Sequence, residues 1–265
     1  MGKLVPGYEV SEGAGVNIVR YVGTPALDNV DPVLMLDEFK SDDPDDYIAG
    51  FPSHPHRGFE TITYMLHGKM RHIDSTGSES VLASGGIQRM TAGRGLVHSE
   101  MPEMEKGLMW GYQVWVNLPS VNKMMQPSYE DTPPENIPWS GKDYGRVKVI
   151  CGEFEGQKGP VEIVVPFDFL DVELKGIFYY HRNYQGLIRI LEGSAEVNGT
   201  LIGEENYIYQ FEVGEKLEIT SRSGGRFILI GGEPIGESIV RGGPFVMNTR
   251  EEISQAYLDF REGRF

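Results

Sequence analysis

Two short motifs in the first half of the chain carry side chains suited to metal binding. His54-Pro55-His56 and His98-Ser99-Glu100 each place two potential ligands two residues apart. Residues i and i+2 of an extended strand point to the same face of a sheet. If the two motifs meet, they offer three imidazoles and one carboxylate to a single metal ion.

The carboxylate of this predicted site has two candidates. Glu100 follows His98 on the same motif, whereas Glu60 lies an even number of residues after His56 and faces the same interior if the strand is regular. We favour Glu100 as the ligand and Glu60 as a supporting residue near the site. Three nitrogens and one oxygen without a thiolate suit Fe(II), Mn, Ni, Cu or Zn, and the pattern does not choose among them.

The remaining histidines and the single cysteine are expected to have ordinary structural roles. His67, His72 and His181 are predicted to be surface or hydrogen-bonded residues, not ligands. Structural zinc sites are closed and often rich in thiolates, so a purely structural metal is the less favoured interpretation. Cys151 has no second cysteine to pair with, and we expect it to be a small apolar core residue.

Composition narrows the class of protein. The chain has 265 residues, 40% of them apolar, with 34 glycines and 16 prolines but no collagen-like period, which favours many turns between short strands. The net charge of -15 argues against direct binding of nucleic acid. An N-terminus without an apolar run and the absence of a membrane-spanning stretch predict a cytoplasmic protein without membrane contact.

Short strand-like runs occur in both halves of the chain and are separated by Gly-rich turns. These runs predict an all-β fold made of sandwiches or barrels. The predicted strands are 16–21, 33–39, 60–66, 70–74, 80–82, 87–91 and 110–116 in the first half, and 147–151, 161–165, 169–174, 186–191, 195–197, 208–211, 216–220 and 227–230 in the second.

The division into domains follows from a proline-rich stretch. Residues 118–145 contain five prolines among polar residues and are expected to be irregular. We therefore predict an N-terminal metal-binding barrel over 1–130, a linker over 131–145, and a C-terminal barrel without metal over 146–265. Thr249 and Glu252 fit a capping box that starts an amphipathic helix over 251–260, which we expect to act as a structural clasp.

Several segments together resemble the pirin family, which belongs to the cupin superfamily. They are His54-Pro55-His56-Arg57-Gly58-Phe59-Glu60-Thr61, the run 90–102 around Gly93-Arg94-Gly95, Trp115-Val116-Asn117-Leu118-Pro119, and Gly243-Pro244-Phe245-Val246-Met247-Asn248-Thr249. The resemblance implies a bicupin, with two jelly-roll-like β-barrels in one chain. It also implies a metal, usually iron, bound by His54, His56, His98 and Glu100 in the N-terminal barrel. The resemblance is weakest over 153–214, and the stretch from Gly93 to His98 is longer than in the general cupin motif.

The same resemblance implies two candidate functions. The first is an iron-dependent quercetin 2,3-dioxygenase, in which a flavonol binds the metal, Glu100 takes up the hydroxyl proton, and O2 is consumed. The second is a protein-interaction cofactor of transcription whose surface depends on the oxidation state of the metal. Arg57, Arg89 and Arg94 would then form a local basic patch, or else serve as structural arginines, and the overall acidity favours a protein partner.

Overall fold

The computed structural model describes residues 2–104 and 106–265, and the chain divides into two compact units. The apolar unit comprises Met1–Tyr8, Tyr21–Val33 and Glu135–Pro234; the histidine unit comprises Glu9–Arg20, Leu34–Pro134 and Ile235–Phe265. This division differs from the linear one expected from the sequence, because the last segment of the chain joins the unit that contains the histidine motifs. Within the described residues, no helix is long and apolar enough to span a bilayer.

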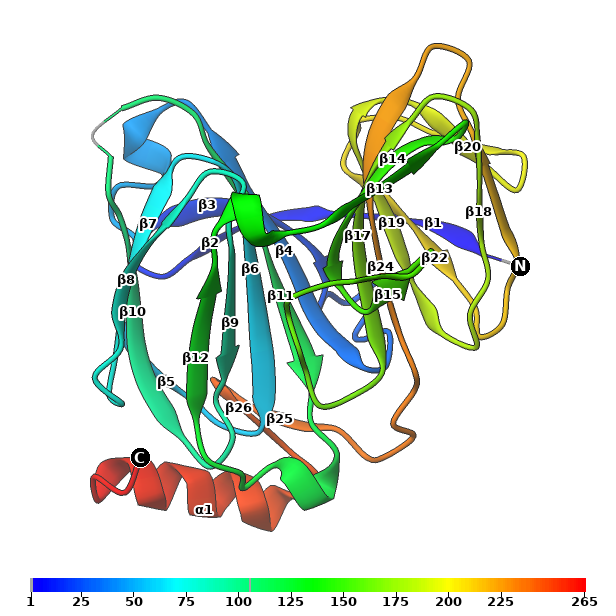
Figure 1. Ribbon diagram of the computed structural model, residues 1–265. Helices are drawn as coiled ribbons and strands as arrows, with labels where there is room; N and C mark the ends of the chain where they lie inside the picture. The colour runs from blue at the N-terminus through cyan, green and yellow to red at the C-terminus, as the bar shows by residue number, and fades with distance from the viewer. Residues whose placement is uncertain (1, 105) are drawn as a thin grey trace. The chain divides into compact units, whose positions relative to one another are not determined.

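The histidine unit is built from a seven-stranded and a four-stranded sheet (Figure 1). Strands central to the larger sheet are buried on both faces, whereas its edges are partly exposed. In order, the larger sheet contains β12 (Ser128–Thr132), β9 (Ile87–Thr91), β6 (Phe59–His67), β11 (Met109–Asn117), β4 (Val33–Ser41), β3 (Val16–Val22) and β2 (Tyr8–Glu12). The smaller sheet contains β5 (Phe51–His56), β10 (Leu96–Pro102), β7 (Lys69–Asp74) and β8 (Glu79–Ala83).

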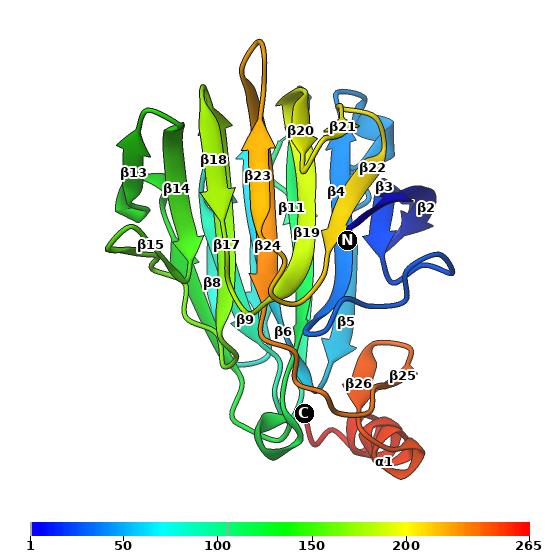
Figure 2. The same cartoon turned by 90° about the vertical axis from the view of Figure 1, so that its right-hand side faces the viewer.

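The apolar unit repeats this arrangement of seven and four strands. The four strands of its smaller sheet lie side by side in Figure 2. The larger sheet contains β1 (Lys3–Pro6), β22 (Tyr207–Phe211), β19 (Gln185–Gly193), β24 (Gly225–Gly232), β17 (Phe167–Leu174), β14 (Gly145–Cys151) and β13 (Trp139–Lys142). The smaller contains β18 (Ile177–Tyr180), β23 (Leu217–Thr220), β20 (Ala195–Val197) and β21 (Thr200–Ile202), and the hairpin β15 (Glu153–Phe154) and β16 (Gln157–Lys158) is separate.

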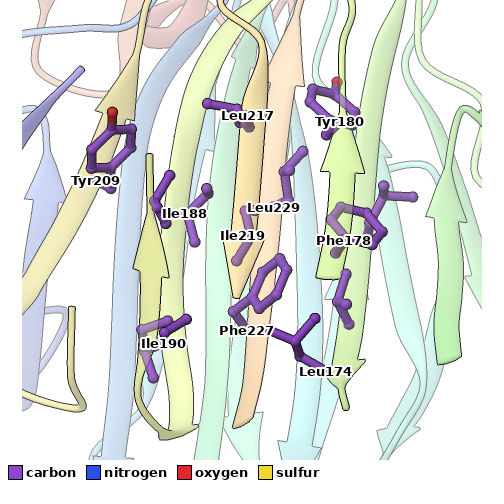
Figure 3. Packing of buried hydrophobic residues seen from close by; sticks show 14 of the residues in the cluster. Leu174, Phe178, Tyr180, Ile188, Ile190, Tyr209, Leu217, Ile219, Phe227 and Leu229 are labelled. Carbon is purple, nitrogen blue, oxygen red and sulfur yellow. The ribbon is translucent and has the colours of Figure 1, made fainter. Parts of the chain in front are cut away.

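The core of the apolar unit lies between its two sheets. Inward side chains of β18 and β23 pack against those of β19 and β24, and Figure 3 shows Phe178, Ile219 and Phe227 gathered at its centre. Cys151 is buried at the end of β14, as expected for a small apolar residue. Burial of these large side chains supplies the main driving force for folding of the unit.

Most predicted strands are confirmed within a residue or two, and two regions differ. Residues 161–165 form no strand beyond a bridge from Val161 to Cys151, because Pro160 and Pro166 flank them. Conversely, the proline-rich stretch contains β12, β13, and two short 3-10 helices, η2 (Ser120–Asn122) and η3 (Pro134–Asn136). A third, η1 (Pro44–Asp46), lies in the acidic loop before β5. The prolines at 127 and 133 flank β12 and do not interrupt it, so its pairing with β9 is intact.

The end of the chain forms the clasp that the sequence predicted. A hairpin of β25 (Val240–Gly242) and β26 (Phe245–Met247) leads into α1 (Arg250–Arg261), and both bonds of the Thr249–Glu252 capping box are present. In Figure 1, α1 runs beside this hairpin. Phe245 contacts the rings of Tyr257 and Phe260 at centroid distances of 5.0 and 6.5 Å. The helix therefore packs on the histidine unit through its aromatic side chains.

Candidate metal centre

Three adjacent strands of the smaller sheet in the histidine unit each present a pair of side chains spaced by two residues. Backbone register places His98 of β10 opposite His54 of β5 on one side and opposite Asp74 of β7 on the other. Glu100 lies opposite His72. Because directly opposed residues share a face, strand pairing collects all three pairs on one side of the sheet. The two motifs singled out in the sequence are neighbours in space.

The prolines of β5 are compatible with its position in the sheet. Pro52 and Pro55 cannot donate to a ladder, and β5 is the edge strand beside β10. Pro55 also favours an extended backbone at His54. An edge strand with alternating histidines and prolines therefore keeps both imidazoles on one face without losing sheet hydrogen bonds.

The three histidines form a compact cluster. Their ring centroids are 4.6 Å apart for His54 and His56, 4.4 Å for His54 and His98, and 5.0 Å for His56 and His98. One ring nitrogen from each lies within 4.8 Å of the others. His56 and His98 are buried, and His54 is half-buried. This spacing can accommodate one metal ion bound by three imidazoles.

Hydrogen bonds outside the cluster orient two of these rings. The Nδ1 atoms of His54 and His56 lie 2.8 and 3.3 Å from the carbonyl oxygens of Pro52 and Pro244. A carbonyl oxygen only accepts, so each Nδ1 carries the proton and each Nε2 keeps its lone pair. Nε2 of His98 is buried and has no hydrogen-bond partner within the described residues. This orphaned nitrogen is the observation that best fits a bound metal.

Burial favours the neutral form of the His56 and His98 imidazoles. It lowers the pKa of His56 to about 3, with a further lowering from nearby His54. Burial, and then the neighbouring histidines, lower the pKa of His98 well below its ordinary value. A neutral imidazole is the form that binds a metal, so the apolar surroundings favour ligation over protonation.

Glu100 is brought to the cluster but belongs to a second grouping. It is buried, and its Oε2 accepts a hydrogen bond of 2.9 Å from Nε2 of Gln113. Its carboxylate lies within 4.8 Å of ligand atoms of His98 and His72, whereas the first group contains the three motif histidines. Glu60 is also buried but lies on β6, where it accepts from Thr91 of β9. That bond gives Glu60 a role in holding two strands of the larger sheet together.

His72, which was expected to be a surface or hydrogen-bonded residue and not a ligand, is hydrogen-bonded and lies beside the histidine cluster. It is fully buried, with Nε2 3.0 Å from Oδ2 of Asp74 and Nδ1 3.4 Å from Nδ1 of His98. His-Ile-Asp at 72–74 has the same spacing as the two recognised motifs. This spacing was the one sequence feature that could have indicated that His72 lies at the site. His67 and His181 are exposed, as expected.

Aromatic and apolar side chains line the remainder of the site. His56 meets the rings of Phe59 and Trp115 edge-on at about 5 Å, and those two rings stack on each other. Next to Glu100 is a cavity of about 10 Å³, enough for roughly one water molecule. Its lining residues are Ile18, Asp37, Phe39, Phe51, Met70, Glu100 and Gln113.

Arg57 follows directly after His56 and connects the site to α1. Its guanidinium pairs with Asp259 at 2.7 Å, donates to the carbonyl of Arg94, and lies over the ring of Phe265. Arg57 is 2% exposed, so it is a structural arginine and does not contribute to a surface basic patch. The same residue thus holds the segments before β6 and β10 against the end of the chain.

A buried lysine reinforces this connection. Nζ of Lys123 donates to the carbonyls of Gly58 and Val246 and to Oδ1 of Asn117, at 2.7 to 2.9 Å. Burial lowers its pKa to about 8. Gly58 has a positive φ of 90°, and a Cβ there would lie 2.0 Å from the Val246 oxygen. Only glycine permits β26 to approach this closely.

Comparison with known proteins places the chain in a family. The Pirin profile matches residues 15–116, and the Pirin C-terminal cupin domain profile matches residues 170–265. A pirin-like protein of Caulobacter vibrioides is 44% identical over 99% of this chain and 98% of its own length. A Pseudomonas aeruginosa protein named "Putative quercetin 2,3-dioxygenase PA3240" is also 44% identical, over 98% and 96%.

A solved structure agrees with the sequence matches. The crystal structure of a quercetin 2,3-dioxygenase from Acinetobacter baumannii is 30% identical, with a TM-score of 0.90, over 100% of this chain and 98% of that one. The predicted all-β fold with two cupin domains and one short helix is therefore confirmed. From its profiles, its relatives and its fold, this chain belongs to the pirin family.

Proposed function

We propose that the histidine unit binds one iron(II) ion through His54, His56, His98 and Glu100, and that the loaded protein is a dioxygenase of the quercetin 2,3-dioxygenase type. The observation that carries the proposal is the buried, unpartnered Nε2 of His98 beside two imidazoles whose Nδ1 atoms are already engaged. Three neutral nitrogens and a carboxylate without thiolate suit iron(II). The names of relatives that match nearly the whole chain support the activity.

The reaction divides into roles for the metal and for the chain. Iron(II) held by these ligands would supply a Lewis acid with open positions for adjacent flavonol oxygens and for O2. Glu100 would take up the flavonol hydroxyl proton, since it lies beside the histidine cluster. Gln113 donates to Oε2 of Glu100 and so fixes the plane of the carboxylate. Burial of the cluster keeps bulk water from competing for the proton.

Entry of a flavonol requires the apolar wall of the site to move. The cavity beside Glu100 has room for about one water molecule, much less than a three-ring substrate. Phe51 and Met70 line it, and Met70 has an unbranched, adaptable side chain. We therefore assign these two side chains as the ones that a flavonol displaces.

The test is turnover by the reconstituted protein. Metal-free protein is loaded separately with Fe(II), Mn, Ni, Cu and Zn and mixed with quercetin under air. We expect the iron form to consume O2 and release carbon monoxide in equal amounts. His56→Ala should abolish both signals because it removes a ligand. His181→Ala, which changes an exposed histidine of the apolar unit, is the matched control and should retain them.

The opposite outcome is equally clear. If none of the five metal forms turns quercetin over, the dioxygenase assignment is wrong. A pull-down that recovers a partner protein only with the metal-loaded form would then favour the interaction function instead.

A further inference from the structure

The pair His72 and Asp74 on β7 has no role in the function proposed above, although it contacts the site directly. His72 lies between two groups, with Nε2 3.0 Å from Oδ2 of Asp74 and Nδ1 3.4 Å from Nδ1 of His98. Both residues are buried, and the ring of Tyr129 stacks on His72 at 4.2 Å. Asp74, His72 and His98 therefore form a buried hydrogen-bonded series that ends at a candidate metal ligand.

The hydrogen-bond directions from Asp74 through His72 to His98 can be assigned by starting at Asp74. Oδ1 of Asp74 accepts from the backbone N–H groups of Thr76 and Ser78 and from the Thr76 hydroxyl. Such a set of donors favours an ionised carboxylate, which can only accept. Nε2 of His72 must then carry a proton, and in the neutral imidazole Nδ1 of His72 is an acceptor.

The contact between His72 and His98 determines which ring nitrogen of His98 carries the proton. Because Nδ1 of His72 accepts, Nδ1 of His98 must donate, and Nε2 of His98 keeps its lone pair. That nitrogen is the one found buried and without a hydrogen-bond partner. His54 and His56 reach the same tautomer through backbone carbonyls. His98 differs because β10 is paired on both sides, with β5 and β7, so its partner comes from a side chain.

We propose that His72 and Asp74 are positioning residues that hold His98 in the tautomer and orientation required to bind the metal through Nε2. The inference rests on the proposed metal centre but not on the dioxygenase activity. Partners of this kind usually change metal affinity by about 10- to 100-fold when removed.

A direct bond from His72 to the metal is the competing arrangement. His72, His98 and Glu100 do form a group within 4.8 Å. That arrangement would use Nδ1 of His98 as the ligand atom, whereas His54 and His56 keep Nδ1 engaged with carbonyl oxygens and present Nε2. It would also leave Nε2 of His98 buried without any partner, so the positioning role accounts for more of the geometry.

Asp74→Asn is the sharpest test because the backbone fixes how the new amide sits. The N–H groups of Thr76 and Ser78 need an acceptor, so the amide oxygen stays with them and the NH2 faces His72. His72 must then accept at Nε2 and donate from Nδ1, which moves the His98 proton to Nε2 and blocks ligation. His72→Phe is the second variant, since it keeps the stack on Tyr129 but removes the acceptor. Asp143→Asn, which removes the charge of an exposed carboxylate in the apolar unit, is the matched control.

Two measurements at one fixed pH read out the result. Zinc dissociation constants come from competition with a chromophoric chelator, and ¹⁵N NMR of the metal-free protein reports which His98 ring nitrogen carries the proton. We expect Asp74→Asn and His72→Phe to weaken zinc binding by about 10- to 100-fold, with Asp143→Asn unchanged. In the NMR spectra, His98 should be protonated at Nδ1 in the native protein and at Nε2 in Asp74→Asn.

The possible failures are separable. Zinc affinity within about twofold of native in Asp74→Asn, or an unchanged His98 tautomer, overturns the inference. Complete loss of zinc binding in His72→Phe alone also overturns it, since that result makes His72 a ligand. A native protein that binds no divalent metal overturns the metal centre and this inference together. Weakened zinc binding without any quercetin turnover supports the inference and rejects only the proposed activity.

Discussion

The two units share one arrangement of strands and differ in what fills it. By sheet order, β18, β23 and β20 of the apolar unit take the places that β5, β10 and β7 take in the histidine unit. The register matches as well, since Ile219 lies opposite Phe178 and Val197 while His98 lies opposite His54 and Asp74. Apolar side chains such as Phe178 and Ile219 (Figure 3) thus stand at the places where the other unit has candidate metal ligands.

The apolar unit shows that the same strand framework can be filled by apolar side chains at these places. The apolar unit is closed by packing among rings such as Phe178 and Phe227, 5.8 Å apart. The histidine unit places buried polar groups at the matching positions, and these need partners. Substitutions at the matching places can therefore test which residues hold the fold and which are needed for the proposed metal.

The largest effect is expected from making the histidine unit resemble the apolar one. His98→Ile installs the side chain found at the matching position, Ile219, and removes a proposed ligand. We expect metal content to fall to background while the circular dichroism spectrum is retained. Elemental analysis of purified protein measures the change. The reciprocal Ile219→His should gain no metal and should destabilise the apolar unit by about 1–3 kcal/mol, because it buries an unpartnered polar group. Metal retained by His98→Ile would refute the ligand assignment.

A somewhat smaller effect is expected in the core of the apolar unit. Phe178→Ala should lower the free energy of unfolding by about 3–5 kcal/mol, because it leaves a cavity among large side chains. Zinc affinity of the folded protein should not change. Tyr179→Ala is the control, because Tyr179 follows Phe178 on the same strand and is 64% exposed. It should shift the free energy of unfolding by at most about 0.5 kcal/mol. Denaturant titration and zinc competition provide the two readings; a change in zinc affinity in Phe178→Ala would show that the units are not energetically separate.

The smallest effect concerns the clasp on the histidine unit. Thr249→Ala removes the side-chain acceptor for the Glu252 amide and should cost about 1 kcal/mol in thermal or denaturant unfolding. Thr249→Ser keeps that acceptor and should lose much less. Equal losses in both variants would mean that the cap bond is not what stabilises the start of α1.

The sequence predicted the local parts of this structure better than the distant ones. Spacing by two residues identified the faces of His54, His56, His98 and Glu100, and alternation located most strands. Neither pattern revealed that β10 lies between β5 and β7, because strand pairing joins segments far apart in the chain. The place of His72 beside His98 was not foreseen for that reason, since alternate polar residues in a strand are common on an exposed face.

The proline-rich stretch and the division into units illustrate the same limit. β12 is a regular strand because β9 pairs with it, and its sequence alone gives little sign of that pairing. Arg57 finds its partner Asp259 more than two hundred residues later. Such long-range contacts decide which unit a segment joins, and no local pattern records them. The resemblance to the pirin family supplied the expected ligand set where spacing left Glu60 open.

The single thiol of the chain has a consequence for studying either unit. Cys151 is buried in the apolar unit, and the chain has no other cysteine. A thiol reagent can reach its sulfur only when that unit opens, so the labelling rate records the opening of one unit without any engineered probe. The rate of thiol labelling thus measures the opening of the apolar unit separately from the histidine unit, in which the candidate metal ligands lie.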